Sequence, residues 1–263
     1  MWSLQRAAKA SESGSPIPTV FEALNRVSVD FRRGQLHLVA AAPGVGKSVF
    51  ALTLAIWAGV PTLYISADSD AATQYARAAS MITGHPVAMV QAAIERNEVE
   101  HYDAAVDGAR HIKFVFDSSP SIDDLNRQML AYGWVYGQWP QLIIVDNASN
   151  IYSEQEGFAG LEEVMDWLHQ LARKTSSCVV ALHHVTGDYE TGDIPVPLSG
   201  LRGKISKLPA LVLTANRVFG EPRLNVAVVK NRSGLAAANG SFGTRLGMDL
   251  SRMWIESKLP AAR

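Results

Sequence analysis

Residues 41–48 have the sequence AAPGVGKS and lie between an apolar run at 36–40 and a helix-like run at 49–58. A strand, a glycine-bearing loop, Lys-Ser and a helix thus follow one another, in the order that a phosphate-binding loop requires. Gly44 and Gly46 let the backbone come close to a ligand, and the N–H groups at the start of the helix attract an anion. The stretch therefore predicts a polyphosphate site at the end of a parallel strand.

Within this loop, we expect Lys47 to reach the β and γ phosphates of ATP and the hydroxyl of Ser48 to bind Mg²⁺. The motif usually begins with glycine, whereas this chain has Ala41, which can serve there if its φ is negative. The alternative is a chance Gly-Lys-Ser turn, which the flanking strand and helix disfavour. The expected nucleotide-binding residues are Ala42, Pro43, Gly44, Val45, Gly46, Lys47, Ser48 and Val49.

The composition is that of an ordinary globular protein, with 263 residues, 48% hydrophobic and 19% charged. We expect one ATPase domain over residues 18–263, preceded by an arm over residues 1–17. Trp2 and Leu4 would lie on one stripe of a short helix in that arm, which either docks on a neighbouring subunit or is a frayed terminus. No apolar run is long enough to span a membrane and no signal peptide precedes the domain, so we expect a cytoplasmic protein without a membrane partner.

The charge and the cysteine content exclude other classes of protein. A formal net charge of −1 gives no global attraction to nucleic acid, so any DNA contact must come from a local basic patch. The single cysteine, Cys178, excludes an intrachain disulfide and lies in an apolar run, where it is expected to be buried.

Strand-like and helix-like segments alternate along the chain, which predicts a mainly parallel sheet with helices on both faces and an antiparallel extension at the C-terminal edge. The segment 185–201 is rich in glycine and proline and predicts a long mobile loop. The expected strands are 35–41, 62–67, 113–116, 141–146, 178–184, 211–215, 224–229 and 241–248. The expected helices follow the glycine loop to residue 58 and then cover 69–83, 87–96, 99–110, 121–136 and 158–174.

Polar residues with catalytic potential follow three of these strands, at the carboxyl ends where parallel sheets usually carry their ligand-binding and catalytic residues. Asp146 ends the run LIIVD, as the Mg²⁺-binding aspartate of a Walker B motif does. Asp68 follows another strand and is a candidate for polarising the attacking water, although it could instead cap the following helix. His184 could bond the γ-phosphate, while His183 faces the other side of its strand. The histidine pair also suggests a metal, but no cysteine or third histidine lies nearby in sequence.

Lys230 and Arg232 follow the strand predicted at 224–229. Because they are two residues apart, both side chains would project from one face of a strand and could hold one phosphate. The alternative is a basic strand end in solvent.

The chain resembles the RecA-type ATPase core of DnaB-family replicative helicases from about residue 19 onward. The resemblance is carried by the order and spacing of AAPGVGKS, LYISADSD, LIIVDNAS, VVALHHV, LSGLRGKI and VVKNRSG. The chain resembles the compact forms of this family found in phages and plasmids, which lack the N-terminal domain. This resemblance implies that the protein acts in a bacterial cell or a phage-infected host.

The resemblance implies ATP and Mg²⁺ bound by Lys47, Ser48 and Asp146, with Asp68 in the place of the catalytic glutamate. His184 takes the place of the sensor glutamine, and Lys230 and Arg232 would be fingers that reach the nucleotide of an adjacent subunit. Hydrolysis would then require a homo-oligomer, such as a hexameric ring with nucleotide at its interfaces. The family's loop on single-stranded DNA corresponds to Arg202, Gly203 and Lys204, with Lys207 as a further candidate.

This sequence departs from the family at several positions. Asp68 is one methylene shorter than glutamate, and Ala41 and His184 are also unusual residues for their places. The sequence therefore predicts an ATP-hydrolysing, ring-forming DNA helicase but leaves two alternatives open. One is a recombination ATPase of the RecA/RadA kind, in which Lys-x-Lys is usual where this chain has Lys-x-Arg. The other is a non-motor DNA clamp, scaffold or nuclease-associated factor.

Overall fold

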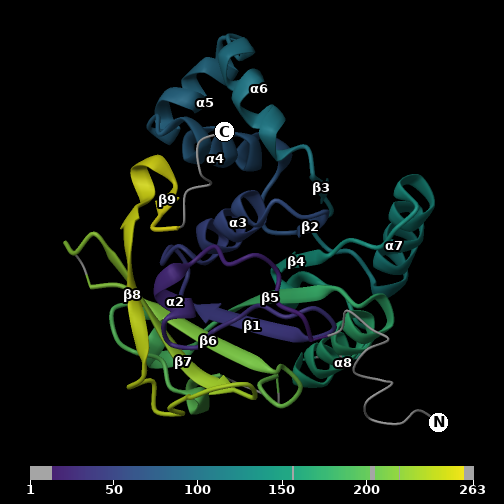
Figure 1. Ribbon diagram of the computed structural model, residues 1–263, viewed down its shortest axis with the longest axis vertical. Helices are drawn as coiled ribbons and strands as arrows, with labels where there is room; N and C mark the ends of the chain where they lie inside the picture. Colours follow the sequence, from purple (N-terminus) through teal and green to yellow (C-terminus); the bar gives the residue numbers. More distant parts are fainter. Residues whose placement is uncertain (1–13, 156, 202–204, 219, 258–263) are drawn as a thin grey trace.

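The chain forms one mixed sheet in this computed structural model, which describes residues 14–155, 157–201, 205–218 and 220–257 (Figure 1). The strands are β1 (Leu36–Ala41), β2 (Thr62–Ser66), β3 (Ile112–Val115), β4 (Leu142–Asp146), β5 (Cys178–His184), β6 (Leu211–Asn216), β7 (Arg223–Asn231), β8 (Gly243–Asp249) and β9 (Trp254–Ile255). The described strands lie in the order β3-β2-β4-β5-β1-β6-β7-β8-β9. From β3 to β6 all neighbours are parallel, and from β6 to β9 they are antiparallel.

One short helix, α2 (Glu22–Asn25), precedes the sheet. The helices between the parallel strands are α3 (Lys47–Ala58), α4 (Ala71–Thr83), α5 (Val87–Glu95), α6 (Glu100–Val106), α7 (Ile122–Tyr136) and α8 (Gly157–Thr175). Short 3₁₀ turns add η1 (Asp107–Ala109), η2 (Ala148–Asn150), η3 (Gly187–Thr191), η4 (Leu198–Gly200) and η5 (Leu250–Arg252). Among the described helices, none combines the length and the apolar composition needed to cross a bilayer.

These elements confirm most of the predicted pattern, including the mainly parallel sheet and its antiparallel extension. The Ser121 side chain accepts a bond from the Asp124 N–H, and the Asp124 carboxylate accepts one from the Ser121 N–H, so α7 begins with a full capping box. The prediction did not include α2 or the two-residue strand β9, both of which are too short to show a hydrophobic period.

The strand order determines which helices cover which face. Because parallel crossovers are right-handed, the connections that run from β1 to β2 and from β2 to β3 lie on one face, and those that run in the opposite direction lie on the other. Accordingly α3 and α4 lie on one side of the sheet and α7 and α8 on the other (Figure 1). Both α3 and α8 pack on β1 and β5, which are buried along almost their whole length.

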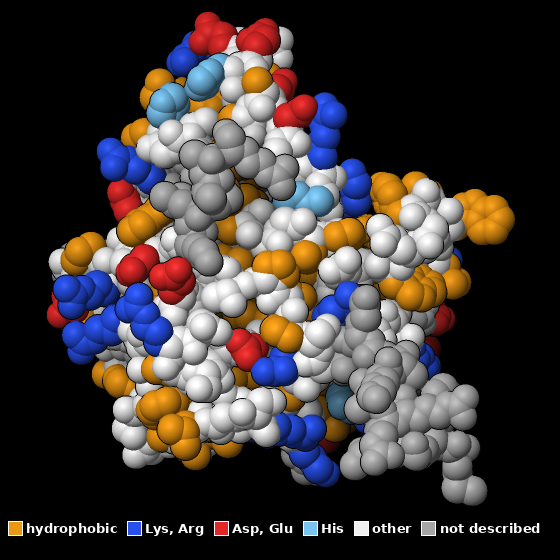
Figure 2. All heavy atoms as spheres, viewed as in Figure 1, with side chains coloured by type: hydrophobic (Ala, Val, Ile, Leu, Met, Phe, Trp, Pro, Cys, Tyr) orange, Lys and Arg blue, Asp and Glu red, His pale blue; other side chains and the backbone are white. Residues whose placement is uncertain are grey.

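Two regions extend beyond this core. A second apolar cluster, built on Ala79, Val90 and Tyr102, holds α4, α5 and α6 together as a lobe at the top of Figure 1. Helix α7, at the right of Figure 1, buries Leu125, Met129 and Tyr132 on its inner face. Its outer face also carries apolar side chains (Figure 2), and Trp134 is 91% exposed.

The described part of the predicted N-terminal arm packs against the sheet. The N–H of Gly14 bonds the carbonyl of Arg33, that of Ile17 bonds the carbonyl of Phe31, and Ile17 is buried in the core. The chain is thus part of the folded domain before residue 18, while residues 1–13, with Trp2 and Leu4, lie outside the described residues.

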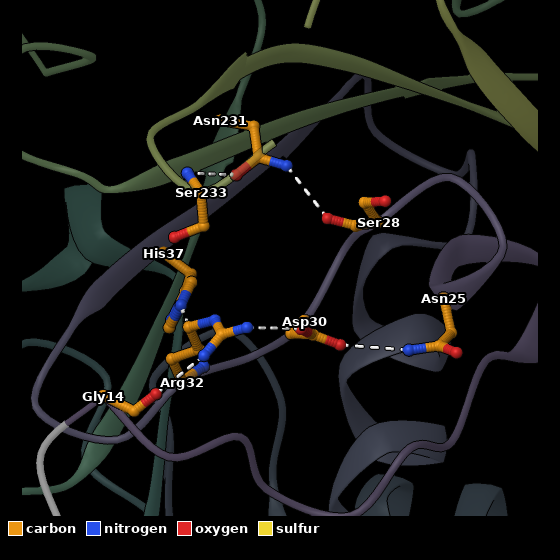
Figure 3. Close-up of polar contacts among 8 residues, drawn as sticks. All are labelled: Gly14, Asn25, Ser28, Asp30, Arg32, His37, Asn231 and Ser233. Atoms are coloured by element: carbon orange, nitrogen blue, oxygen red, sulfur yellow. Dashed lines mark hydrogen bonds and ion pairs between the residues drawn. The ribbon is translucent and has the colours of Figure 1, made fainter. Parts of the chain in front are cut away.

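Arg32 joins this N-terminal segment to His37 of β1, because its guanidinium donates to the carbonyl of Gly14 and its N–H bonds the imidazole (Figure 3). The Nε2 of His37 accepts the N–H of Arg32 at 3.1 Å, so its Nδ1 carries the proton and donates to the carbonyl of Val179 at 3.2 Å. Burial lowers the pKa of His37 to about 4, and the charge of Arg32 contributes to the lowering. The imidazole is therefore neutral in the folded protein at neutral pH.

This neutral histidine makes stability depend on pH. Because the unfolded chain takes up the proton near pH 6.5 and the folded chain only near pH 4, its contribution is complete above pH 6.5 and is lost as the pH falls towards 4. Within that window, His37→Gln should reduce the slope of unfolding free energy against pH by about 1.4 kcal/mol per pH unit. Urea unfolding at several pH values measures the slope. His101→Gln, at an exposed site, is the control, and equal slopes for wild type and His37→Gln would contradict the assignment.

Candidate functional site

The glycine loop lies where the sequence predicts it, between β1 and α3. Gly44 has φ +73° and Gly46 has φ +116°, both in the region that favours glycine. Gly46 occupies the N-cap position without a side-chain cap, so the first N–H groups of α3 remain available to an anion. Ala41 is the last residue of β1 and has no positive φ, which explains why alanine is tolerated there.

Beside the loop is a cavity of about 280 Å³ formed by the ends of β1, β2 and β5 together with α4 and η5. Its lining includes most of the predicted nucleotide-binding residues, and it also includes Asp68 and His184. Val45 is the exception, because its side chain is buried and does not line the cavity. The lining residues are Ala42, Pro43, Gly44, Gly46, Lys47, Ser48, Val49, Asp68, Arg77, His184, Leu250 and Met253.

Lys47 is the cation at the base of this cavity and is only 5% exposed. Burial lowers the pKa of its amine, the charges of Asp146 and Asp68 raise it, and that of Arg77 lowers it. Its Nζ lies 3.4 Å from Nε2 of His184. The two carboxylates thus hold a positive charge where a polyphosphate would need it.

His184 faces Lys47, and His183 does not line the cavity. The pKa of His184 is lowered by burial and by the charge of Lys47, so the ring is neutral at neutral pH and Nε2 can accept from the ammonium group. Its proton is then on Nδ1, which is buried and has no partner among the described residues. For His183, burial lowers the pKa to about 4.

Asp146 is almost fully buried at the end of β4. Its Oδ2 accepts the hydroxyl of Tyr64 at 3.0 Å, and the pKa of Tyr64 is raised by burial and by the aspartate charge. Its Oδ1 is buried without a partner in the described structure. A buried carboxylate oxygen without a donor suits a hydrated cation beside Ser48, so the residues present fit Mg²⁺. Tyr64 was not predicted, because a tyrosine in an apolar strand signals only burial.

Asp68 is exposed and lies next to the same aspartate. The N–H groups of Ala67 and Asp68 both donate to the carbonyl of Asp146, at 2.8 and 3.1 Å, so the ends of β2 and β4 are tied together. The N-cap of α4 is Asp70, which accepts from the N–H of Thr73. Helix capping therefore does not explain Asp68.

Arg77 was also not predicted. It lies seven residues after the Asp70 cap, hence on the same face of α4, and its guanidinium donates to the hydroxyl of Ser69 at 3.0 Å. A basic residue two helical turns after a helix-capping aspartate is a signal that could have identified it.

Lys230 and Arg232 lie at the opposite end of the strands from the glycine loop, near the amino ends of the parallel strands. Because β7 runs antiparallel to β6, Lys230 pairs with Val212 near the point where the parallel strands begin. The six residues of β1 alone separate the two ends by about 17 Å. The Nζ of Lys230 donates to the carbonyls of Ser206 at 2.6 Å and Lys207 at 2.8 Å, and Arg232 donates to that of Lys207 at 3.2 Å. Both side chains thus lie on one face, as expected, but away from their own glycine loop.

The predicted DNA loop is described only in part. Arg202, Gly203 and Lys204 lie outside the described residues, and Lys207 is exposed. The segment before them, predicted as a long mobile loop, is instead anchored to the domain. Val196 is buried and its carbonyl accepts the hydroxyl of Thr214, and the carbonyl of Gly192 accepts the N–H of Arg217.

A parallel sheet of this strand order, with a glycine loop between β1 and α3, defines a RecA-like P-loop domain, a class that binds nucleotides. The chain belongs to the family of the DnaB-like helicase C terminal domain, whose model matches residues 16–238. It is 45% identical over 237 residues to the Gene 65 protein of Mycobacterium phage L5, covering 87% of this chain and 88% of that protein.

Two solved structures show the same fold. One is an ATPase domain with a TM-score of 0.80 and 16% identity, and the match covers 95% of this chain and 94% of that chain. The other is a DnaB-like replicative helicase, solved to study its interactions with primase. It has a TM-score of 0.76 and 15% identity, with 95% of this chain and 63% of that chain covered.

The segment 185–201, called the anchored segment below, lies against the glycine loop at Gly192. Its effect on nucleotide binding can therefore be tested by a substitution at this glycine. A Cβ at Gly192 would lie 2.7 Å from Cγ2 of Val45 and 3.2 Å from Cβ of Ala42, and its φ is +74°. Gly192→Ala should therefore displace the loop and weaken nucleotide binding about tenfold, or about 1.4 kcal/mol. Fluorescent-nucleotide titration measures the affinity.

Gly84→Ala is a matched control, because Gly84 has φ +73° and open space around its Cβ position. Both variants should lose about 1–2 kcal/mol of stability through the left-handed backbone. Equal nucleotide affinity in the two variants would show that Gly192 does not act through the glycine loop.

Proposed function

We propose that this protein is an ATP-driven motor that assembles into a hexameric ring and translocates on single-stranded DNA as a helicase. Membership of the DnaB-like family supports the ATPase. The similarity to a mycobacteriophage protein supports action inside a phage-infected bacterial cell.

The observation that carries the proposal is the separation of the two halves of the site. Lys47 lies at the carboxyl ends of the parallel strands, and Lys230 and Arg232 lie at their amino ends. No motion within one folded subunit brings them together, because the length of the strands separates them. A second copy, with its Arg232 end against the Lys47 end of the first, completes the site and places an ATP between subunits.

The roles proposed for the residues follow from their surroundings. Lys47 and the N–H groups at the start of α3 bind the phosphates. Ser48 and Asp146 hold Mg²⁺, which when bound neutralises charge on the phosphate oxygens. Asp68, exposed in the cavity, orients and deprotonates the attacking water.

His184 is suited to report on the phosphate. Its neutral Nε2 lies where it can accept from the ammonium group of Lys47. When the ammonium group of Lys47 donates to a γ-phosphate instead of to His184, the imidazole is free to form its own hydrogen bond to the phosphate. The chain leads from His184 through the anchored segment to residues 202–204, the loop proposed for DNA together with Lys207. Binding there uses the DNA backbone and is independent of sequence.

Two other functions are compatible with the same fold, a recombination ATPase and a non-motor DNA clamp or nuclease-associated factor. Arg232 in the Lys-x-Arg pair favours the helicase. A strand-displacement assay on a forked duplex, run beside a measurement of oligomer size, separates the three. Unwinding by a ring supports the motor, strand exchange on a filament supports a recombinase, and ATP-dependent DNA binding without either supports a clamp.

The shared site can be tested by mixing variants. Lys47→Ala should abolish ATP hydrolysis because it removes the phosphate-binding cation. Arg232→Ala should abolish hydrolysis but leave ATP binding intact, because the finger belongs to the neighbouring site. Each variant retains the half that the other lacks, so a mixture should recover part of the steady-state ATPase rate.

Two results would contradict these assignments. Wild-type turnover by Lys47→Ala would show that the nucleotide site lies elsewhere. No recovery in the mixture, with size measurements showing mixed assemblies, would place Arg232 outside the neighbour's site. Arg26→Ala, at an exposed arginine paired with Glu22, is the control and should hydrolyse ATP like wild type.

The DNA loop can be tested through salt. The log of the DNA affinity falls as the log of the salt concentration rises. Removing two phosphate contacts with Arg202→Ala and Lys204→Ala should make this fall less steep by about 1.4, at about 0.7 per contact on a single strand. Fluorescence anisotropy with labelled single-stranded DNA measures the slope. The paired surface arginines Arg110 and Arg127, both changed to alanine, should leave it unaltered. An unchanged slope in the first double variant would move the DNA site to another surface.

A further inference from the structure

A second cavity, of about 440 Å³, lies around Arg232 at the end of the strands opposite the glycine loop. Its basic lining comprises Arg33, which precedes β1, His169 and Arg173 on α8, and Arg232, which follows β7. We propose that this basic cavity binds a phosphate chain and that Arg173 is a phosphate ligand beside Arg232. The inference deepens the proposed function and rests on it, since the phosphates of a neighbouring subunit's ATP are the natural occupant.

The arginines come together from three distant parts of the sequence. His169 and Arg173 are four residues apart on α8, hence one helical turn apart on the same face. Arg232 reaches the cavity with its guanidinium fixed by the carbonyl of Lys207, to which it donates at 3.2 Å. Arg33 is fixed by the carbonyl of Ser176, to which its Nε donates at 3.2 Å. Two of the three arginines are thus held by backbone carbonyls, while Arg173 is placed by helix α8.

The described lining of this cavity contains no carboxylate. Neither Arg173 nor Arg232 forms an ion pair with a described residue, whereas Arg26, Arg110 and Arg127 each pair with an acid one helical turn away. Asp166, on the same face of α8, instead accepts from Gln170 at 2.6 Å. Arg173 and Arg232 line the same cavity, so one anion bound there would face both guanidinium groups.

His169 supplies a second, independent observation. Its Nδ1 is buried and has no hydrogen-bond partner in the described structure. Its pKa is lowered by burial and then by the charges of Arg173 and Arg232, which outweigh the raising effect of Asp166, so the ring is neutral beside two cations. An anion between the arginines would offset both charges and could also accept a bond from the imidazole.

Phosphate is the anion that fits this arrangement best. A guanidinium donates two parallel N–H bonds to phosphate oxygens, and two guanidiniums from different elements can hold one chain at successive phosphates. The chain could belong to the nucleotide of an adjacent subunit or to free inorganic polyphosphate. Helix α8 also favours a cation in its last turn because of its dipole, but that effect alone does not require a shared cavity with Arg232.

The anion site is tested first without hydrolysis. In the Lys47→Ala background, which lacks the phosphate-binding cation of the glycine loop, calorimetry with tripolyphosphate should still detect binding. Adding Arg173→Ala should weaken that binding at least tenfold, and Arg173→Lys should weaken it less, since the charge remains and the fork is lost. Lys174→Ala, at the exposed neighbour that does not line the cavity, should change it less than twofold.

The contribution to the neighbour's site is tested by mixing. Arg173→Ala alone should lower steady-state ATP hydrolysis at least tenfold while ATP binding is unchanged, and Lys47→Ala subunits should restore part of the rate. Equal tripolyphosphate binding by the Arg173→Ala and Lys174→Ala proteins would overturn the anion site. Binding that depends on Arg173 together with no rescue in the mixture would overturn its role toward the neighbour and leave free polyphosphate as the ligand. Because calorimetry needs no ATPase, it distinguishes this site from a failure of the proposed motor.

Discussion

The site depends on how Asp146 is held at the end of β4. Its carbonyl accepts the N–H groups of Ala67 and Asp68, which fixes the end of β2 against β4. One of its carboxylate oxygens is occupied by Tyr64, and the other is buried without a donor among the described residues. Burying an ionised carboxylate is unfavourable unless a positive charge lies nearby. The charge of Lys47 therefore favours the buried Asp146 carboxylate, and the charges of Asp146 and Asp68 in turn favour the protonated amine of Lys47. The glycine loop, the two aspartates and the lysine thus form one group of interacting charges and dipoles.

The sequence predicted those parts of the site that lie in a contiguous motif or at the end of an apolar run. The glycine loop is contiguous, and the strands that carry Asp146 and His184 are long apolar runs whose ends are visible in the sequence. Since parallel strands end at the same edge, their polar ends are expected to lie together. Lys230 and Arg232 were noticed from their spacing after a strand, but their role toward an adjacent subunit came from the family resemblance, because a basic pair after a strand is by itself ambiguous.

The remaining residues are set by tertiary packing that leaves no periodic signal. Tyr64 looks like any buried aromatic residue, and Arg77 and Arg173 look like solvated helix positions until the folded chain brings other charges beside them. The segment 185–201 was predicted as mobile because glycine and proline exclude regular structure. Those residues do not exclude packing, and Val196 is buried there nevertheless.

The Lys47 site and the Arg232 cavity lie at opposite ends of the strands of one sheet, and two kinds of symmetry can set one against the other. In a two-fold dimer the contact is made twice, because residue i meets j and j meets i, and the assembly closes at two subunits. A heterologous, head-to-tail contact is made once at each interface and either closes into a ring or continues as a helical filament. In the proposed ring every interface therefore has a direction and holds one complete site.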